Sequence, residues 1–217
     1  MIGKLFAVTV AALVSSAASA AIQWTDWTAI SPTVATGTLA GANVSFTGPF
    51  DTSQIAGGFD YWRTGGNPWA AYDALSNLPT NNDFISPSGN QVLHTFTFSK
   101  AIRDPYIAII SQGQLGVQTT WTFNAPFTLI DQGQGFWGNG VFTIVGNTIG
   151  AGEAHGVIQF KGNFTSLTLL SNNTENWSGL TVGTPGIVPE PESWAMLIAG
   201  MGLVGVAARR RRRAAVA

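Results

Sequence analysis

The sequence predicts an all-β fold, a β-sandwich of jelly-roll type with about ten strands, followed by a short hydrophobic helix at the C-terminus. Apolar and polar residues alternate over short runs, which is the pattern of half-buried strands. Glycine, asparagine and proline separate these runs. The region between the two ends of the chain shows no convincing amphipathic helix. These observations together favour two packed antiparallel sheets.

The clearest strand covers residues 91–99, where His94, Phe96 and Phe98 share one face and threonines occupy the other. This alternation places the His94 imidazole in the core. Residues 105–111 form a more continuous apolar run, which predicts a central strand covered on both faces. The other strands are expected at 22–29, 42–46, 119–123, 127–132, 140–145, 156–161, 166–170 and 179–182.

Residues 49–90 differ from the rest, because glycine, asparagine, proline and aromatic residues dominate and alternation is weak. We expect long loops here that cross one end of the sandwich, with at most one helical turn at 73–77. Loops of this length in a compact domain are usually functional or disordered. The aromatic rings between Phe59 and Tyr72 favour an ordered loop.

The N-terminal residues have the three parts of a secretory signal peptide. Lys4 provides the positive charge, residues 5–14 form the apolar stretch, and small residues at Ala18 and Ala20 mark a cleavage site. Cleavage after Ala20 makes Ala21 the first residue of the mature protein. The sequence therefore predicts export from the cytoplasm.

The C-terminal residues combine a proline-bracketed acid, a short apolar run and a block of arginines. Pro189 and Pro191 flank Glu190 and hold this segment extended, because each proline fixes φ and lacks a backbone donor. The apolar run, residues 194–208, has 15 residues, whereas a membrane span needs about 20. A basic flank stays on the cytoplasmic side of a membrane. The arginines of this flank are Arg209, Arg210, Arg211, Arg212 and Arg213.

The C-terminal residues resemble the PEP-CTERM sorting signal in the segment 188–191, in Trp194 with the apolar run, and in the arginine block. The resemblance covers about residues 187–213, with Ser193 as an extra residue in the spacing. It implies processing by an exosortase-type enzyme of a Gram-negative bacterium that also makes exopolysaccharide. Transient anchoring in the inner membrane would precede placement at the cell surface, outer membrane or extracellular matrix. The alternative is a single-pass anchor that is never cut.

These features divide the chain into a signal peptide (1–20), one ectodomain (21–187), a sorting segment (188–213) and a short tail (214–217). The ectodomain holds four basic and nine acidic side chains, which gives a net charge of −5. A surface with so little positive charge excludes nucleic acid as a partner. The absence of cysteine excludes disulfides, thiol catalysis and thiolate zinc sites.

Seven of the eight tryptophans lie in the ectodomain. An indole stacks on the apolar face of a sugar ring while neighbouring amides bind its hydroxyls, so the composition favours binding of exopolysaccharide. The alternative is that the rings fill the core, as we expect for Trp121 between strand threonines. The candidate carbohydrate-binding residues, chosen from the glycine-rich and asparagine-rich loops, are Trp62, Trp69, Tyr72, Trp137 and Asn139.

Four aspartates of the 49–90 region, Asp51, Asp60, Asp73 and Asp83, are candidate ligands for a structural Ca²⁺. Carboxylate and carbonyl oxygens suit this ion, although the spacing matches no EF-hand. Solvated loop carboxylates and turn caps are the alternative. We expect no other cofactor.

No nucleophile, zinc-protease or phosphate-loop motif is present, and we expect no enzymatic activity. His155 lies next to a carboxylate, Glu153, but the pair lacks a nucleophile motif. The expected function is that of a structural or adhesive protein of the cell surface or matrix. The alternative is a secreted polysaccharide hydrolase, because two acids brought together by folding leave no spacing in the sequence.

Processing at both ends predicts a mature protein that begins at Ala21 and lacks the arginine block. The intact mass of the protein isolated from its native cell reports both ends and any attached group. A mass of 22.8 kDa, that of the whole chain, would contradict this prediction.

Overall fold

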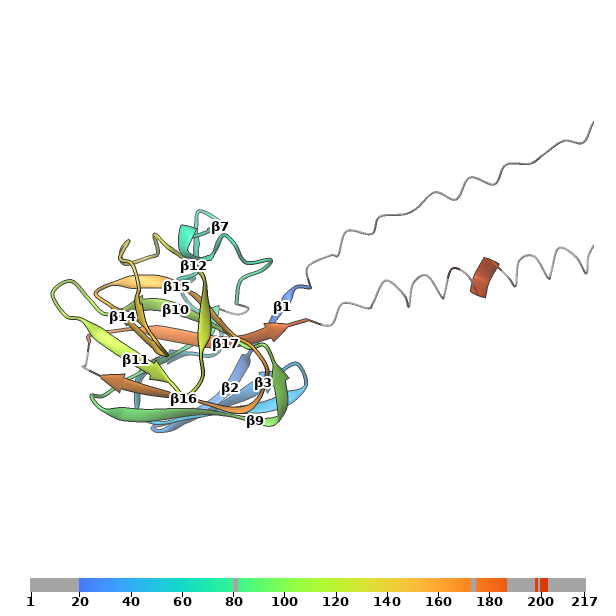
Figure 1. The fold of residues 1–217 in the computed structure, drawn as a ribbon, viewed down its shortest axis with the longest axis horizontal. Coiled ribbons are helices and arrows are strands. Elements are labelled where there is room, and N and C mark those ends of the chain that lie inside the picture. The colour runs from blue at the N-terminus through green and yellow to red at the C-terminus, as the bar shows by residue number, and fades with distance from the viewer. Residues whose placement is uncertain (1–19, 80–81, 173–174, 187–197, 199, 203–217) are drawn as a thin grey trace, which may run out of the picture. The chain divides into compact units, whose positions relative to one another are not determined.

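The computed structural model describes residues 20–79, 82–172, 175–186, 198 and 200–202. One compact unit runs from Ala20 to Gly186, and residues 1–19 and 187–217 form the other. The first unit consists of two antiparallel sheets and a two-stranded ribbon. Figure 1 shows the sheet with β15, β10 and β17 stacked on the sheet with β16 and β9. The predicted all-β sandwich is confirmed.

The second unit has few described residues. Residues 198 and 200–202 are helical, and the rest of the predicted C-terminal helix lies outside the described residues. Within the part of the chain that the structure describes, no helix is long and apolar enough to cross a membrane.

The seven-stranded sheet has the order β12-β15-β10-β17-β8-β5, and β1 pairs with the end of β17. β10, β15 and β17 are buried along nearly their whole length, so this sheet is covered on both faces. The central strand predicted at 105–111 is therefore confirmed. The strands are β1 (Ile22–Trp24), β5 (Phe50–Gln54), β8 (Phe84–Pro87), β10 (Tyr106–Gln112), β12 (Phe127–Gly133), β15 (Ala154–Phe160) and β17 (Gly179–Pro185).

The eight-stranded sheet has the order β13-β14-β11-β16-β9-β4-β3-β2. Buried and exposed residues alternate along β3 and β4, so the outer face of this sheet is open to solvent. The strands are β2 (Asp26–Ser31), β3 (Val34–Leu39), β4 (Ala42–Thr47), β9 (Val92–Arg103), β11 (Thr119–Phe123), β13 (Thr143–Val145), β14 (Thr148–Ala151) and β16 (Asn163–Asn172).

The main core lies between the two sheets, and inward-facing side chains of both fill it. Phe96 is fully buried there, with its ring centroid 4.8 Å from that of Phe46. His94 is also fully buried, and its Nε2 lies 3.2 Å from Ser171 Oγ. Burial lowers the pKa of His94 to about 4, so the imidazole is neutral. The core positions predicted for His94 and Trp121 are confirmed.

A second core covers the outer face of the seven-stranded sheet. Ile107 and Ile109 of β10 point into the main core, whereas Ala108 and Ile110 point outward. Residues 61–78 lie over these outward side chains and bury Trp62 and other rings against them. This segment contains β6 (Arg63–Thr64), β7 (Asn67–Pro68) and the 3₁₀ helix η1 (Ala70–Tyr72). The hydroxyl of Tyr72 donates a 2.8 Å hydrogen bond to the Ile109 carbonyl.

The prediction that residues 49–90 are all loop is wrong. β5 and β8 lie within this region and add two strands to one edge of the seven-stranded sheet. All four residues of β8 are buried, so no alternation marks it in the sequence. The segment between these strands covers a sheet face rather than only crossing an end. The helical turn is also earlier than predicted, at Ala70–Tyr72 rather than at 73–77.

The substitution Phe96→Ala should lower the free energy of unfolding by about 3–5 kcal/mol, because it leaves a cavity in the main core. The exposed Leu93 of the same strand provides the control, and Leu93→Ala should change stability by less than about 0.5 kcal/mol. Chemical denaturation measures both. Equal effects of the two substitutions would contradict the placement of β9.

Candidate functional site

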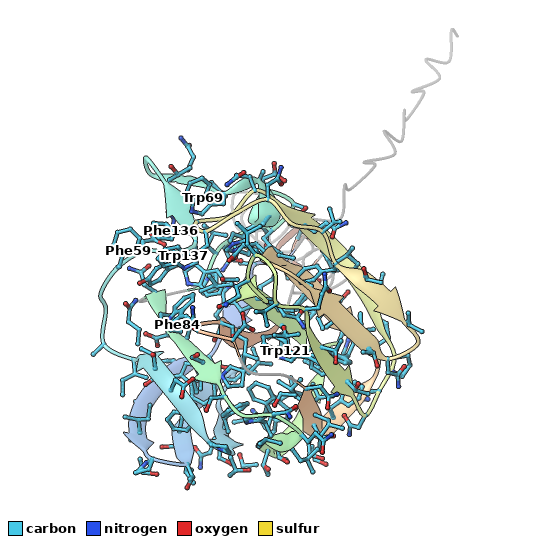
Figure 2. The ribbon with its side chains drawn as sticks, turned by 90° about the vertical axis from the view of Figure 1, so that its left-hand side faces the viewer. Phe59, Trp69, Phe84, Trp121, Phe136 and Trp137 are labelled. Carbon is cyan, nitrogen blue, oxygen red and sulfur yellow. The ribbon has the colours of Figure 1, made fainter. Side chains whose placement is uncertain are left out.

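Aromatic rings gather where β12 ends and β17 begins. Three segments far apart in the sequence supply them: the 55–84 region, the turn after β12 and the residues before β17. Figure 2 shows Phe59, Trp69, Phe136 and Trp137 close together, with Trp121 apart from them. We call the following seven residues the aromatic cluster: Phe59, Tyr61, Trp69, Phe84, Phe136, Trp137 and Trp177.

Phe136 is at the centre of the aromatic cluster. Its ring centroid lies 4.9 Å from those of Phe59 and Trp137. Both contacts are edge-on, with interplanar angles of 70° and 87°, which aromatic pairs favour. Phe84 is buried, whereas Phe59 and Trp137 are each 54% exposed. The aromatic cluster is thus anchored from below and open to solvent on one side.

The turn that carries Trp137 packs tightly on the start of β15. Gly135 leaves no room for a Cβ above the His155 ring, and a Cβ on Gly138 would lie 2.6 Å from Glu153 Cγ. The turn is closed by a 2.8 Å hydrogen bond from the Gly135 N–H to the Gly138 carbonyl. The glycines therefore allow the close approach that holds Trp137 in place.

A buried polar group lies beneath this turn. Ser111 and Glu153 have φ of 54° and 83°, in the left-handed region that non-glycine residues seldom adopt. The Ser111 N–H donates to His155 Nδ1 at 3.2 Å, which leaves the proton of a neutral imidazole on Nε2. Nε2 faces Glu153 Oε1 at 3.6 Å, and Ser111 Oγ donates to the same oxygen at 2.5 Å. His155 is fully buried.

Glu175 lies two residues before Trp177 and is largely removed from solvent. Burial raises its pKa to about 8. A hydrogen bond from the Gly113 backbone opposes this shift, and the nearby Glu153 charge adds to it. Thr119 Oγ1 donates a 3.4 Å hydrogen bond to Glu175 Oε1. The carboxyl is therefore mostly protonated at neutral pH.

The structure brings some of the predicted carbohydrate-binding residues together. Trp69 and Trp137 belong to the aromatic cluster, and Asn139 is exposed in the same turn as Trp137. Trp62 and Tyr72 are fully buried, and their rings pack at 5.2 Å in the second core. The prediction for these two is wrong, because neither ring has a face open to a ligand.

Phe59, Phe136 and Trp177 are site residues that the sequence did not predict. Phe136 adjoins Trp137 in the sequence, so its neighbour was a usable signal. Trp177 follows an asparagine-rich stretch, the same context that selected Trp137. Nothing in the sequence indicated that Phe59 would contact Phe136.

The four aspartates predicted as calcium ligands lie in different surroundings. Asp60 forms a 3.0 Å ion pair with Arg63, and Asp51 and Asp73 are exposed. Asp83 is buried and accepts a 3.0 Å hydrogen bond from the Trp27 N–H. Burial raises the pKa of Asp83 to about 6. Among the described residues, no three His, Cys, Asp or Glu side chains could hold a metal ion, so these aspartates do not assemble the predicted site.

Residues 188–213 match the family model of the PEP-CTERM protein-sorting motif. The chain carries a PEP-CTERM sorting motif. The motif indicates export, C-terminal membrane-anchored sorting and processing of the exosortase type. Searches of curated proteins and of solved structures found no match.

The predicted PEP-CTERM signal lies outside the described residues, and so does Ala18. The signal residues are 189–191, Trp194 and the arginines 209–213. At the predicted signal-peptide cleavage site, Ala20 and Ala21 are described. The Ala21 carbonyl accepts a 2.9 Å hydrogen bond from the Gly186 N–H. The two ends of the sandwich unit therefore lie side by side.

The raised pKa of Glu175 predicts a pH-dependent stability. A carboxyl with a folded pKa of about 8 and an unfolded pKa of about 4.3 favours folding fully below pH ~4 and loses this contribution as the pH rises through 8. The melting temperature should therefore fall between about pH 6.5 and 8.5, and Glu175→Gln should reduce this fall.

Asp83→Asn is the matched control. The folded pKa of Asp83 is about 6, so its contribution to stability is lost mainly below pH ~6.5, and this variant should keep the fall between about pH 6.5 and 8.5. Thermal unfolding at several pH values measures all three proteins. Parallel curves for the parent and Glu175→Gln above pH ~6.5 would contradict the assignment.

Proposed function

We propose that the ectodomain is a structural or adhesive protein of the cell surface or extracellular matrix that binds exopolysaccharide through the aromatic cluster. The main support is the pair of exposed rings, Phe59 and Trp137, which both contact Phe136. Exposed aromatic groups of this kind mark binding surfaces. The sorting motif supports the same function, because it directs the protein out of the cytoplasm.

The packing of Trp137 suits it for binding a sugar ring. Its indole contacts Phe136 at 4.9 Å and Trp177 at 6.3 Å, so little side-chain freedom is left to lose when a ligand binds. The exposed Asn139 and Gln134 of the same turn offer amide donors and acceptors for hydroxyl groups. A flat ring beside a few polar groups is a common arrangement for binding a sugar.

The second candidate function is a polysaccharide hydrolase, and Glu175 is the observation that favours it. A protonated carboxyl next to an aromatic surface is typical of the general acid of glycosidases. Against this, Glu153 is engaged by Ser111, and His155 is fully buried beneath Gly135. The surroundings of these groups support binding without turnover, which is the function that we propose.

Trp137→Ala should weaken binding of the mature protein to immobilised exopolysaccharide from its native cell by at least about tenfold, because the stacking ring is lost. The unfolding temperature should remain nearly unchanged, because the ring is half-exposed. Leu115→Ala removes an apolar side chain that is 90% exposed, and binding should remain.

Equal retention of Trp137→Ala and the parent would remove the proposed binding site. An assay for new reducing ends on the same polysaccharide tests the second candidate. Release of reducing ends that is abolished by Glu175→Gln would establish a hydrolase instead.

A further inference from the structure

We infer that the glycan recognised by the aromatic cluster is uncharged, and that the site discriminates against polymers of uronic acids or sulfated sugars. This inference rests on the proposed function and names the chemical class of its ligand. It follows from the distribution of charged side chains between the two ends of the sandwich.

Three of the four basic residues of the ectodomain lie at the end opposite the aromatic cluster. The C-terminal ends of β9 and β15 both lie at this opposite end, next to the turn that connects β9 to β10. Arg103 is in register with Asn163, two residues beyond Lys161. Lys100 lies three residues before Arg103, against the turn at Gly41. An anionic polymer at the aromatic cluster is therefore remote from these cations.

The aromatic end carries acidic groups instead. Asp60 lies between Phe59 and Tyr61 in the sequence, and Glu153 underlies the turn of Trp137. Asp51 lines the same small cavity as Trp177. Glu175 lines this cavity too, but its carboxyl is mostly protonated at neutral pH and adds little negative charge there. The remaining basic residue of the ectodomain, Arg63, is in an ion pair with Asp60 at 3.0 Å.

This arrangement disfavours a polyanion for two reasons. A uronate next to acidic side chains is repelled over about 8–10 Å at physiological salt, which is the screening length. A carboxylate or sulfate that leaves water also needs Arg or Lys partners, and among the described residues at this end only the paired Arg63 is basic. Such like-charge contacts are a means of rejecting wrong ligands.

An uncharged glycan avoids both costs. Its ring faces pack on Phe59 and Trp137, which are exposed and adjacent to Phe136. Its hydroxyls can donate hydrogen bonds to carboxylate groups, each of which accepts up to about four. The acidic groups that repel a uronate are thus acceptors for a neutral sugar.

The experiment compares laminarin, a neutral glucan, with alginate, a polyuronate, as soluble ligands of the mature protein. Affinity electrophoresis at low and at high salt measures both. Laminarin binding should depend on Trp137 and change by less than about twofold with salt, because no ion pair forms. Alginate should bind at least about tenfold more weakly at low salt, and the difference should narrow at high salt.

Two variants that each raise the net charge by one unit show where on the surface alginate is repelled. Asp51→Asn removes one negative charge at the aromatic end, where Asp51 is exposed, and should strengthen alginate binding at low salt. Ala101→Lys adds one positive charge at the opposite end, where Ala101 is exposed, and should not. Equal effects of the two variants would overturn the inference, because net charge alone would then explain the preference.

The outcomes separate this inference from the proposed function. Trp137-dependent binding of alginate as tight as that of laminarin overturns the inference and leaves the proposed binding site intact. Binding of neither laminarin, alginate nor the native exopolysaccharide overturns the proposed function and, with it, the inference.

Discussion

The outer face of the seven-stranded sheet is apolar and has to be covered, and the candidate site depends on what covers it. Ala108, Ile110 and Val157 point outward from the sheet, and residues 61–78 bury them with Trp62 and Tyr72. Burial of each large apolar side chain contributes roughly 1.5–3 kcal/mol. The same segment carries rings of the aromatic cluster, so the packing that stabilises the sheet also positions the surface that we propose for binding.

Beneath the aromatic cluster, strained backbone and a buried carboxyl lower the stability of the fold locally. The apolar burial in the two cores offsets this loss. Ser111 and Glu153 adopt left-handed backbone conformations, and Glu175 is held mostly protonated by burial. The domain has no cysteine, so no disulfide contributes to its stability. Its stability therefore comes from sheet pairing and from the burial of aromatic and aliphatic side chains on both faces of the seven-stranded sheet.

Patterns that are local in the sequence were predictable, and contacts between distant segments were not. The alternation around His94 and the apolar run at 105–111 predict the sandwich. The sorting motif is a pattern of consecutive residues, so it is identified without knowledge of the fold. β8 was missed because burial on both faces removes alternation. Trp62 and Trp137 occupy loops of similar composition, yet Trp62 is buried and Trp137 is exposed. Trp62 is buried because its segment covers the outer face of the seven-stranded sheet, and the sequence does not show which loop does so.

Nuclear magnetic resonance of the indole N–H groups during titration with laminarin is the most direct test of the account. Resonances of Trp137 and Trp177 should shift with ligand, because their rings form part of the aromatic cluster. The resonance of Trp27, which is fully buried in the main core and donates to Thr181 Oγ1, should remain in place. Shifts confined to the outer face of the eight-stranded sheet, with the indoles of Trp137 and Trp177 unchanged, would contradict the account.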